Sequence, residues 1–311
     1  MKSVKPQQPP EGSNRTLTGS RVLFGSVGPA LISGAVQAGA LSPIDRALYL
    51  SVFHHRPFLS AANFVKPFHG ALNAVAYRVT SASLYLGLQD VATLTLPPSD
   101  CGVCQRALVG VFAGTGNGIL LNHLQAIKYQ MWTTNQPTTV HTVKFMYSKG
   151  GIKSFTNGMA VNVGRDGCFG ITYETTRHIL KWGNASSSSP FVDALTNCTA
   201  AGLGTIISSP LNYARNLKYG TIPGQTVPTV THLLKELMNS VRQKNTFREK
   251  MVLLQARLVL GWGTARVALG MTLGQGIFDL AKRRALQMEE AKREKVHPLS
   301  DVLSEEAKRY D

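Results

Sequence analysis

Six apolar segments, arranged in three pairs, constrain the fold of this chain more than any other feature of its sequence. The first member of each pair contains no aspartate, glutamate, lysine or arginine and is about 20 residues long. An α-helix of that length rises about 30 Å, which is the thickness of the hydrocarbon core of a bilayer. The composition and length predict membrane-spanning helices at 22–44, 107–127 and 194–214.

The second member of each pair has a charged residue near its middle. These segments are 71–89 with Arg78, 154–173 with Arg165 and Asp166, and 258–278 with Arg266. A charge at the centre of a membrane helix costs about 2.5–3.5 kcal/mol on insertion scales, so such a side chain should face protein or a water-filled cavity. We therefore expect six transmembrane helices with three arginines directed toward the interior.

The uncharged segments end in degenerate copies of one motif. The copies begin at positions 43, 123 and 210, which gives spacings of 80 and 87 residues. They read Pro43-x-Asp45-x-x-Leu48, His123-x-Gln125-x-x-Lys128 and Pro210-x-Asn212-x-x-Arg215. A period this long, built from pairs of apolar segments, indicates a tandem-repeat membrane protein. The divisions that follow are a polar tail at 1–20, repeats at 21–97, 98–187 and 188–285, and a charged tail at 286–311.

Composition and the two tails fit a membrane protein. Charged residues make up 16% of the chain, against about 25% in soluble domains, and the net charge is +16. Basic residues follow the apolar segments instead of forming one block, so we expect no nucleic-acid partner. Residues 1–20 resemble neither a secretory signal nor a transit peptide, because Glu11 interrupts them. Residues 282–295 should extend the last helix into water, and His297-Pro298 should end it.

Metal, cofactor and enzyme signatures are missing from the sequence. Cys101-Gly-Val-Cys104 has no second ligand pair at the spacing of a zinc site. The two alternatives are that Cys101 and Cys104 form a disulfide at the membrane edge or that both remain unpaired thiols. The sequence also contains no Gly-rich phosphate loop and no nucleophile elbow. We therefore predict neither a metal site nor an enzyme.

Glycines favour close packing of the third apolar segment. Gly110, Gly114 and Gly118 repeat every four residues and so lie on one helix face. Small residues at this spacing let helix backbones approach closely within lipid. We expect this face to contact a neighbouring helix.

Together these features resemble the mitochondrial carrier family. In that family each of three repeats has two long helices with a short surface helix between them, and the odd helices end in P-x-[DE]-x-x-[KR]. The element before the family's even helices is matched closely by residues 149–158, which read Lys-Gly-Gly-Ile-Lys-Ser-Phe-Thr-Asn-Gly, and partly by Phe68-His69-Gly70. The even helices of the family end in [FY]-[DE]-x-x-[KR], which is complete at Phe278-Asp279-x-x-Lys282 and reduced to Lys181 in the second repeat.

The resemblance implies a fold and a location. The fold would be an all-α membrane protein with six transmembrane helices in three tandem pseudo-symmetric repeats and short surface helices. The protein would lie in the mitochondrial inner membrane with both termini in the intermembrane space. Repeat one departs from the pattern, because Pro57 and Pro67 occupy the stretch where a surface helix is expected.

The resemblance also implies three kinds of site. Substrate would bind at the central residues of the even helices, and lipid, including cardiolipin, at glycine-rich helix starts. The predicted substrate residues are Arg78, Arg165, Asp166 and Arg266, and the predicted lipid residues are Gly150, Gly151, Asn157 and Gly158. The gate on the intermembrane side would use Lys181, Phe278, Asp279 and Lys282.

The matrix-side gate is where the sequence departs most from the family. We expect Asp45 to pair with Lys128 and Gln125 to hydrogen-bond to Arg215, while Asn212 faces Leu48 and gains nothing. Two functions are compatible with these features: the central arginines favour the first, and the lost gate pairs favour the second. The first is a solute carrier that exchanges a small anionic or amino-acid-like metabolite by alternating access. The alternative is a structural or accessory subunit that keeps the carrier fold without cycling and belongs to a larger membrane assembly, for example a respiratory complex.

Overall fold

The described part of the chain consists of α-helices and one 3-10 turn. The structure, a computed structural model, describes residues 18–95, 102–183 and 189–307. The elements are α1 (Thr18–Phe53), η1 (Ala61–Asn63), α2 (Ala71–Thr95), α3 (Gly102–Leu120), α4 (Asn122–Thr134), α5 (Thr139–Gly150), α6 (Lys153–Thr156), α7 (Met159–Gly183), α8 (Pro190–Gly220), α9 (Val230–Arg242), α10 (Phe247–Leu258) and α11 (Trp262–Ala307). The predicted all-α fold is confirmed for these residues.

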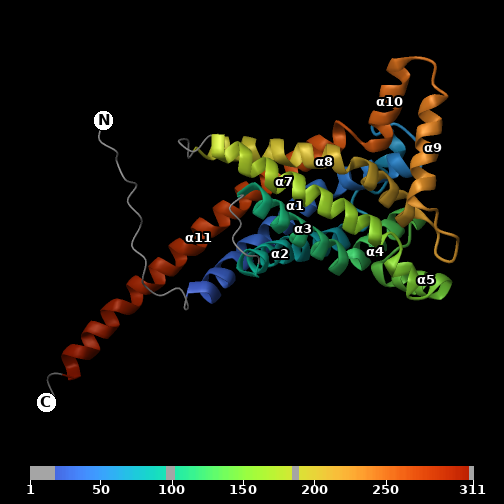
Figure 1. The fold of residues 1–311 in the computed structure, drawn as a ribbon. Coiled ribbons are helices and arrows are strands. Elements are labelled where there is room, and N and C mark those ends of the chain that lie inside the picture. The colour runs from blue at the N-terminus through green and yellow to red at the C-terminus, as the bar shows by residue number, and fades with distance from the viewer. Residues whose placement is uncertain (1–17, 96–101, 184–188, 308–311) are drawn as a thin grey trace, which may run out of the picture.

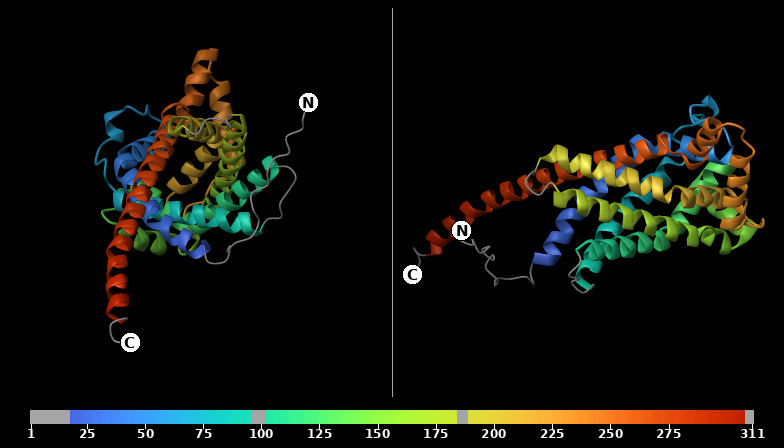
Figure 2. Two further views of the ribbon diagram at one scale, coloured as in Figure 1. Left: turned by 90° about the vertical axis from the view of Figure 1, so that its left-hand side faces the viewer. Right: turned by 45° about the horizontal axis from the view of Figure 1, so that its top comes forward.

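Six helical stretches form a closed ring. Each packs against the next in the order α1, α2, α3, α7, α8 and α11, and α11 packs back against α1. Figure 1 shows the bundle from the side, and the left panel of Figure 2 looks along it. Each stretch overlaps one of the six apolar segments of the sequence, but the segments 107–127, 154–173 and 258–278 each run across a break between two helices. Helices that are far apart in the chain, such as α1 and α11, therefore become neighbours.

The two ends of the bundle differ. Helices α5, α9 and α10 gather at one end, which we call the surface-helix end, whereas α1 begins and α11 ends at the other (Figure 1). Repeat one has only η1 at the surface-helix end, as Pro57 and Pro67 predicted. The side chain of Asn63 holds this loop by donating to the carbonyl oxygens of Pro57 and Phe58 at 2.9 and 3.0 Å.

Several prolines lie inside continuous helices. Pro43 and Pro210 lie inside the continuous helices α1 and α8. The sharp bend, 56°, lies between α3 and α4 at Leu121, in the repeat where histidine replaces the proline. Helix α11 continues to Ala307, so the expectation that His297-Pro298 ends it is wrong. A proline inside a helix removes one hydrogen bond, and the helix can continue beyond it with a kink.

Two expectations concern residues outside the described ranges. The polar tail predicted at 1–20 falls there except for its last three residues, which already belong to α1. The Cys101-x-x-Cys104 pair includes Cys101, which also lies outside these ranges. The choice between a disulfide and two thiols therefore stays open.

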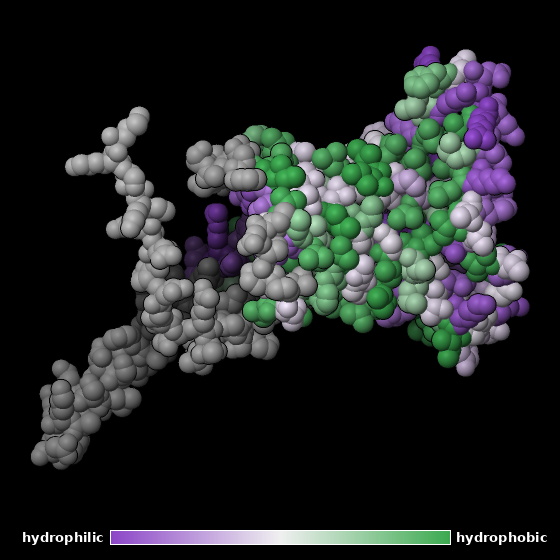
Figure 3. Space-filling view, viewed as in Figure 1, coloured by the Kyte–Doolittle hydropathy of each residue, from purple (hydrophilic) through white to green (hydrophobic). Residues whose placement is uncertain are grey.

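The outer surface of the bundle is rich in apolar side chains. Figure 3 shows apolar atoms over the flank of the bundle and hydrophilic atoms concentrated at the surface-helix end. Each helix of the ring exposes large apolar residues, for example Ile32, Leu72, Phe112, Ile171, Ile206 and Leu269. Exposed apolar surfaces that extend over a whole flank are typical of contact with lipid or with another protein.

Among the described residues, no single helix meets the length and hydropathy expected of a membrane span. Two bent pairs meet it together, α3 with α4 and α10 with the first part of α11. The count of six transmembrane helices stays a prediction.

The predicted glycine face brings α3 against α7. A Cβ atom added to Gly110 would collide with the carbonyl oxygen of Gly170, and one added to Gly114 would collide with that of Asp166. At Gly118 the added atom would lie 3.1 Å from the Cα atom of Val163. The expected close helix contact is confirmed, and it places α7 with its charged pair beside α3.

We predict that Gly114→Ala lowers the free energy of unfolding by about 1–3 kcal/mol, because the added methyl group must push two helix backbones apart. The matched control is Gly39→Ala in α1, where an added Cβ atom meets nothing within 4 Å. An alanine inside a helix is favoured over glycine, so the control should be neutral or slightly stabilising. Thermal unfolding of the detergent-solubilised variants measures both effects. Equal shifts in the two variants would contradict the close contact.

Candidate functional site

A cavity of about 420 Å³ lies at the centre of the ring. It is lined by side chains from α1, α2, α4, α7, α8 and α11 among others, so every repeat contributes to it. Among the described lining residues, six are cationic and three are carboxylates. They are Arg78, Lys128, Arg165, Arg177, Arg215 and Arg266 on one side and Asp45, Asp166 and Glu174 on the other. The cavity therefore holds more positive than negative groups.

Asp45 joins three helices in the middle of the cavity. Its carboxylate accepts from the guanidinium of Arg266, with Nη2 at 2.5 Å from Oδ2 and Nε paired with Oδ1. Arg78 approaches the same carboxylate at 3.7 Å. Asp45 comes from α1, Arg78 from α2 and Arg266 from α11. The two arginines line the cavity as expected, but one carboxylate already pairs with both.

Arg165 and Asp166 form an ion pair within α7. The guanidinium of Arg165 also lies over the ring of Phe169, at 5.5 Å from its centroid. Asp166 is 6% exposed, and its Oδ2 atom is buried without a hydrogen-bond partner, although the residue lines the cavity. One oxygen of this carboxylate is therefore left for a donor that the described residues do not supply.

Lys128 lies among aromatic rings. Its Nζ atom is 4.9, 4.8 and 5.1 Å from the ring centroids of Tyr77, Tyr129 and Trp132. The expected ion pair with Asp45 is not formed between these two described residues, because Arg266 and Arg78 pair with that carboxylate instead. Cation–π attraction stabilises an ammonium group in such a site without providing an acceptor for its protons.

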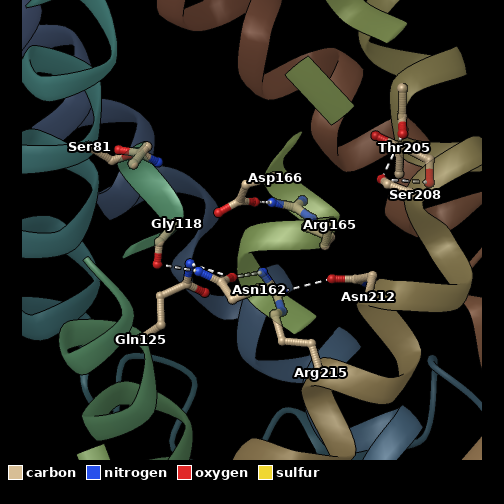
Figure 4. Close-up of polar contacts among 12 residues, drawn as sticks. Ser81, Gly118, Gln125, Asn162, Arg165, Asp166, Thr205, Ser208, Asn212 and Arg215 are labelled. Carbon is tan, nitrogen blue, oxygen red and sulfur yellow. Dashed lines mark hydrogen bonds and ion pairs between the residues drawn. The ribbon is translucent and has the colours of Figure 1, made fainter. Parts of the chain in front are cut away.

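Arg215 is buried among neutral acceptors. It donates to the hydroxyl of Tyr129 at 3.0 Å, to Asn212 Oδ1 at 2.7 Å and to Asn162 Oδ1 at 3.2 Å. Gln125 does not contact Arg215 as expected but donates to the same Asn162 oxygen, at 3.3 Å. Asn212 likewise gains a partner that the sequence had not suggested. The amide of Asn162 replaces the missing acid between α4 and α8 (Figure 4).

Asn162 itself was not predicted from the sequence. It is fully buried, and its Nδ2 atom donates to the carbonyl oxygen of Gly118 at 3.0 Å. It thereby links α3, α4, α7 and α8. An asparagine four residues after Gly158 carries no motif, and its role depends on which helices surround α7.

An aromatic cluster closes the cavity toward the surface-helix end. The cluster consists of Tyr49, Tyr129, Trp132 and Tyr219, all at most 7% exposed. Tyr129 and Tyr219 stack with centroids 5.1 Å apart, and Tyr49 lies 4.5 Å from Tyr129. Met146 of α5 packs against the cluster from outside, whereas Tyr49 and Tyr129 line the cavity. These rings separate the cavity from the surface helices.

The opposite end of the cavity has its own polar groups. Lys181 pairs with Asp193 at 2.9 Å, a partner that the sequence did not suggest. Phe278 lines the cavity, while Asp279 and Lys282 are exposed.

Glu174 was missed by the sequence analysis because it lies one residue beyond the predicted span. It is buried and accepts from Gln89 Nε2 at 2.6 Å.

The predicted lipid residues surround α6 and the start of α7. Gly151 and Gly158 adopt positive φ values of 59° and 77°. A Cβ atom at Gly158 would lie 3.1 Å from the ring of Tyr219, so this glycine allows α7 to begin against the aromatic cluster. Gly150 is packed against Ser154, and Asn157 is half-buried. Lipid binding at these four residues stays a prediction.

One stretch of the chain matches a known protein family. Residues 99–183 match the family model of the mitochondrial carrier protein. The matched stretch contains α3 to α7 and nearly coincides with the second repeat assigned from the sequence, 98–187. This match shows that the second repeat is similar to the mitochondrial carrier family. No curated protein matches the chain.

We predict that Asn162→Ala destabilises the protein, because the Gly118 carbonyl loses its side-chain donor and Gln125 and Arg215 each lose one of their acceptors. A hydrogen bond of this kind contributes about 0.5–1.5 kcal/mol. The control is Asn239→Ala on the exposed surface of α9. Thermal unfolding in detergent should show a clear loss for the first variant and none for the second. A melting temperature unchanged by Asn162→Ala would show that the amide does not hold the four helices together.

Proposed function

We propose that this protein is a solute carrier of the mitochondrial inner membrane that exchanges a small anionic or amino-acid-like metabolite. The observation that carries the proposal is the cavity, which lies inside a ring of six helices and contains twice as many cationic groups as carboxylates. Guanidinium and ammonium groups in a site shielded from water attract carboxylate and phosphate, and the guanidinium fork fits both in a bidentate manner.

Asp166 supports the amino-acid-like part of the proposal. Its Oδ1 atom pairs with Arg165, whereas the buried Oδ2 atom has no partner among the described residues. An ammonium group of the substrate would satisfy that oxygen at little cost, because the carboxylate is already desolvated. A substrate with one amino and one or two acidic groups would use both kinds of charge in the cavity.

The accessory role remains a second candidate, and the gate supports it. A carrier must open each end in turn, so the interactions that close an end have to break when substrate binds. At the surface-helix end this protein uses aromatic packing and neutral amides around Lys128 and Arg215, where the family uses ion pairs. A closure that buries this much aromatic surface also suits a protein that stays in one state within a larger assembly.

A transport assay tests the first proposal. Purified protein in liposomes is loaded with a panel of dicarboxylates, amino acids and phosphate, and exchange of each labelled solute is measured. We expect saturable exchange of one class, and we expect Arg165→Gln to lower it at least tenfold, because the variant removes a cavity charge and leaves Asp166 unpaired. Lys144→Gln on the exposed face of α5 is the control. Exchange that is equal in both variants would remove Arg165 from the binding site.

The native size of the protein separates the two roles. After gentle detergent extraction of mitochondrial membranes, a free carrier should migrate as one chain of 33.7 kDa with its detergent. An accessory subunit should co-migrate with a large complex and remain there at high salt. Recovery in a salt-resistant complex, together with no exchange in liposomes, would replace the carrier proposal by the accessory one.

A further inference from the structure

The strongest unexplained feature of the cavity is the ammonium group of Lys128. The residue is 6% exposed and lines the cavity. Its neighbours within contact distance are the three rings of Tyr77, Tyr129 and Trp132, and among the described residues no oxygen accepts a hydrogen bond from it. An ammonium group has three protons to donate, and aromatic rings supply no acceptor for them. Because Lys128 lines the cavity, its donors can be used by a molecule that enters the cavity.

The charges around Lys128 define what could occupy this place. The charged groups that act most strongly on Lys128 are Asp45, Arg78, Arg215 and Arg266. Asp45 is already paired with Arg266 through both of its oxygens. The region therefore has an uncompensated positive charge, and a further cation would be repelled.

Arg78 supplies a second donor to the same region. Its side chain is 32% exposed, and its contact with Asp45, at 3.7 Å, is longer than a hydrogen bond. Most of its five N–H groups thus remain available toward the cavity, which it also lines. Arg78 comes from α2 and Lys128 from α4, so a group bound by both would connect the first repeat with the second.

We propose that Lys128 and Arg78 form an anion-binding subsite at the surface-helix end of the cavity, which binds a carboxylate or phosphate group of the solute. That the natural ligand is a transported solute rests on the proposed carrier function. In this assignment Lys128 has changed from a gate residue to a binding residue, because Asp45 pairs with Arg266 and no longer with Lys128. When no anion is bound, the three rings hold the ammonium group in place. A bound anion then supplies the missing hydrogen-bond acceptor.

Trp132 provides a direct readout, since its ring centroid is 5.1 Å from Lys128 Nζ. The chain has three tryptophans, so replacing Trp182 and Trp262 by phenylalanine leaves Trp132 as the single reporter. Purified protein in detergent is titrated with succinate and with inorganic phosphate, with chloride at matched ionic strength as reference and 1,4-diaminobutane as a cationic probe. We expect a saturable change of Trp132 emission with succinate, with phosphate or with both, and none with the diamine.

Four variants, one of them a control, make the assignment specific. Lys128→Met keeps an apolar stem among the rings and should weaken anion binding at least tenfold, and Arg78→Gln should weaken it to a lesser degree. Without anion, Lys128→Met should melt at a higher temperature than the parent protein, because one of several neighbouring positive charges in the cavity has been removed. Lys144→Gln is the control and should change neither property. Lys128→Arg keeps the charge and should retain binding, which guards against a packing defect in the methionine variant.

The outcomes distinguish this subsite from the carrier function. If Lys128→Met responds to anions like the parent protein, or if chloride reproduces the response, the subsite is overturned. Anion binding that depends on Lys128 but without any exchange in liposomes would retain the subsite and reject the carrier. Exchange that persists in Lys128→Met would reject the subsite and retain the carrier. A phosphate response without a succinate response would assign the subsite to phosphate groups.

Discussion

The ion pair between Asp45 and Arg266 is the interaction on which the arrangement of the cavity depends. It connects α1 with α11, the first and last helices of the ring, and it lies where the ring closes on itself. In a partly dry interior an arginine is held best by a carboxylate that matches its planar fork. Because Asp45 pairs with Arg266, it does not pair with Lys128. The rest of the surface-helix end must therefore be held together by other interactions.

Those interactions involve aromatic rings and amides. Lys128 and Arg215 both lie beside Tyr129, and Arg215 obtains its acceptors from Asn162 and Asn212. The family's pattern places acids at positions 125 and 212, where this chain has Gln125 and Asn212. An amide offers one oxygen without charge, so each contact is weaker than an ion pair but is also less sensitive to salt. The closure of this end therefore depends more on buried ring surface than on electrostatic attraction.

Much of the fold could be predicted because it follows from periodic features of the chain. The six helices of the ring overlap the apolar segments, although three segments run across a helix break. The contact of α3 with α7 follows from the glycines at 110, 114 and 118, and the lack of a longer surface helix in repeat one follows from two prolines. The partners inside the cavity could not be predicted in the same way. Whether Asp45 meets Lys128 or Arg266 depends on distances between helices more than 80 residues apart in sequence, and Asn162 has no motif at all. The end of α11 was mispredicted because a proline was read as a stop.

The same geometry bears on how such a closure could open. Separation of α4 from α8 would break the donation from Gln130 to the carbonyl oxygens of Tyr219 and Thr221, both at 2.6 Å, and the stack of Tyr129 on Tyr219. Water entering the gap could replace the polar contacts, but it could not replace the burial of the rings. The free energy needed to open this end is therefore mainly that of exposing apolar ring surface to water. A substrate that binds Lys128 and Arg78 would act on this closure from inside the cavity, because Lys128 contacts the rings directly. Such a substrate favours opening only if it binds the open state more tightly than the closed state.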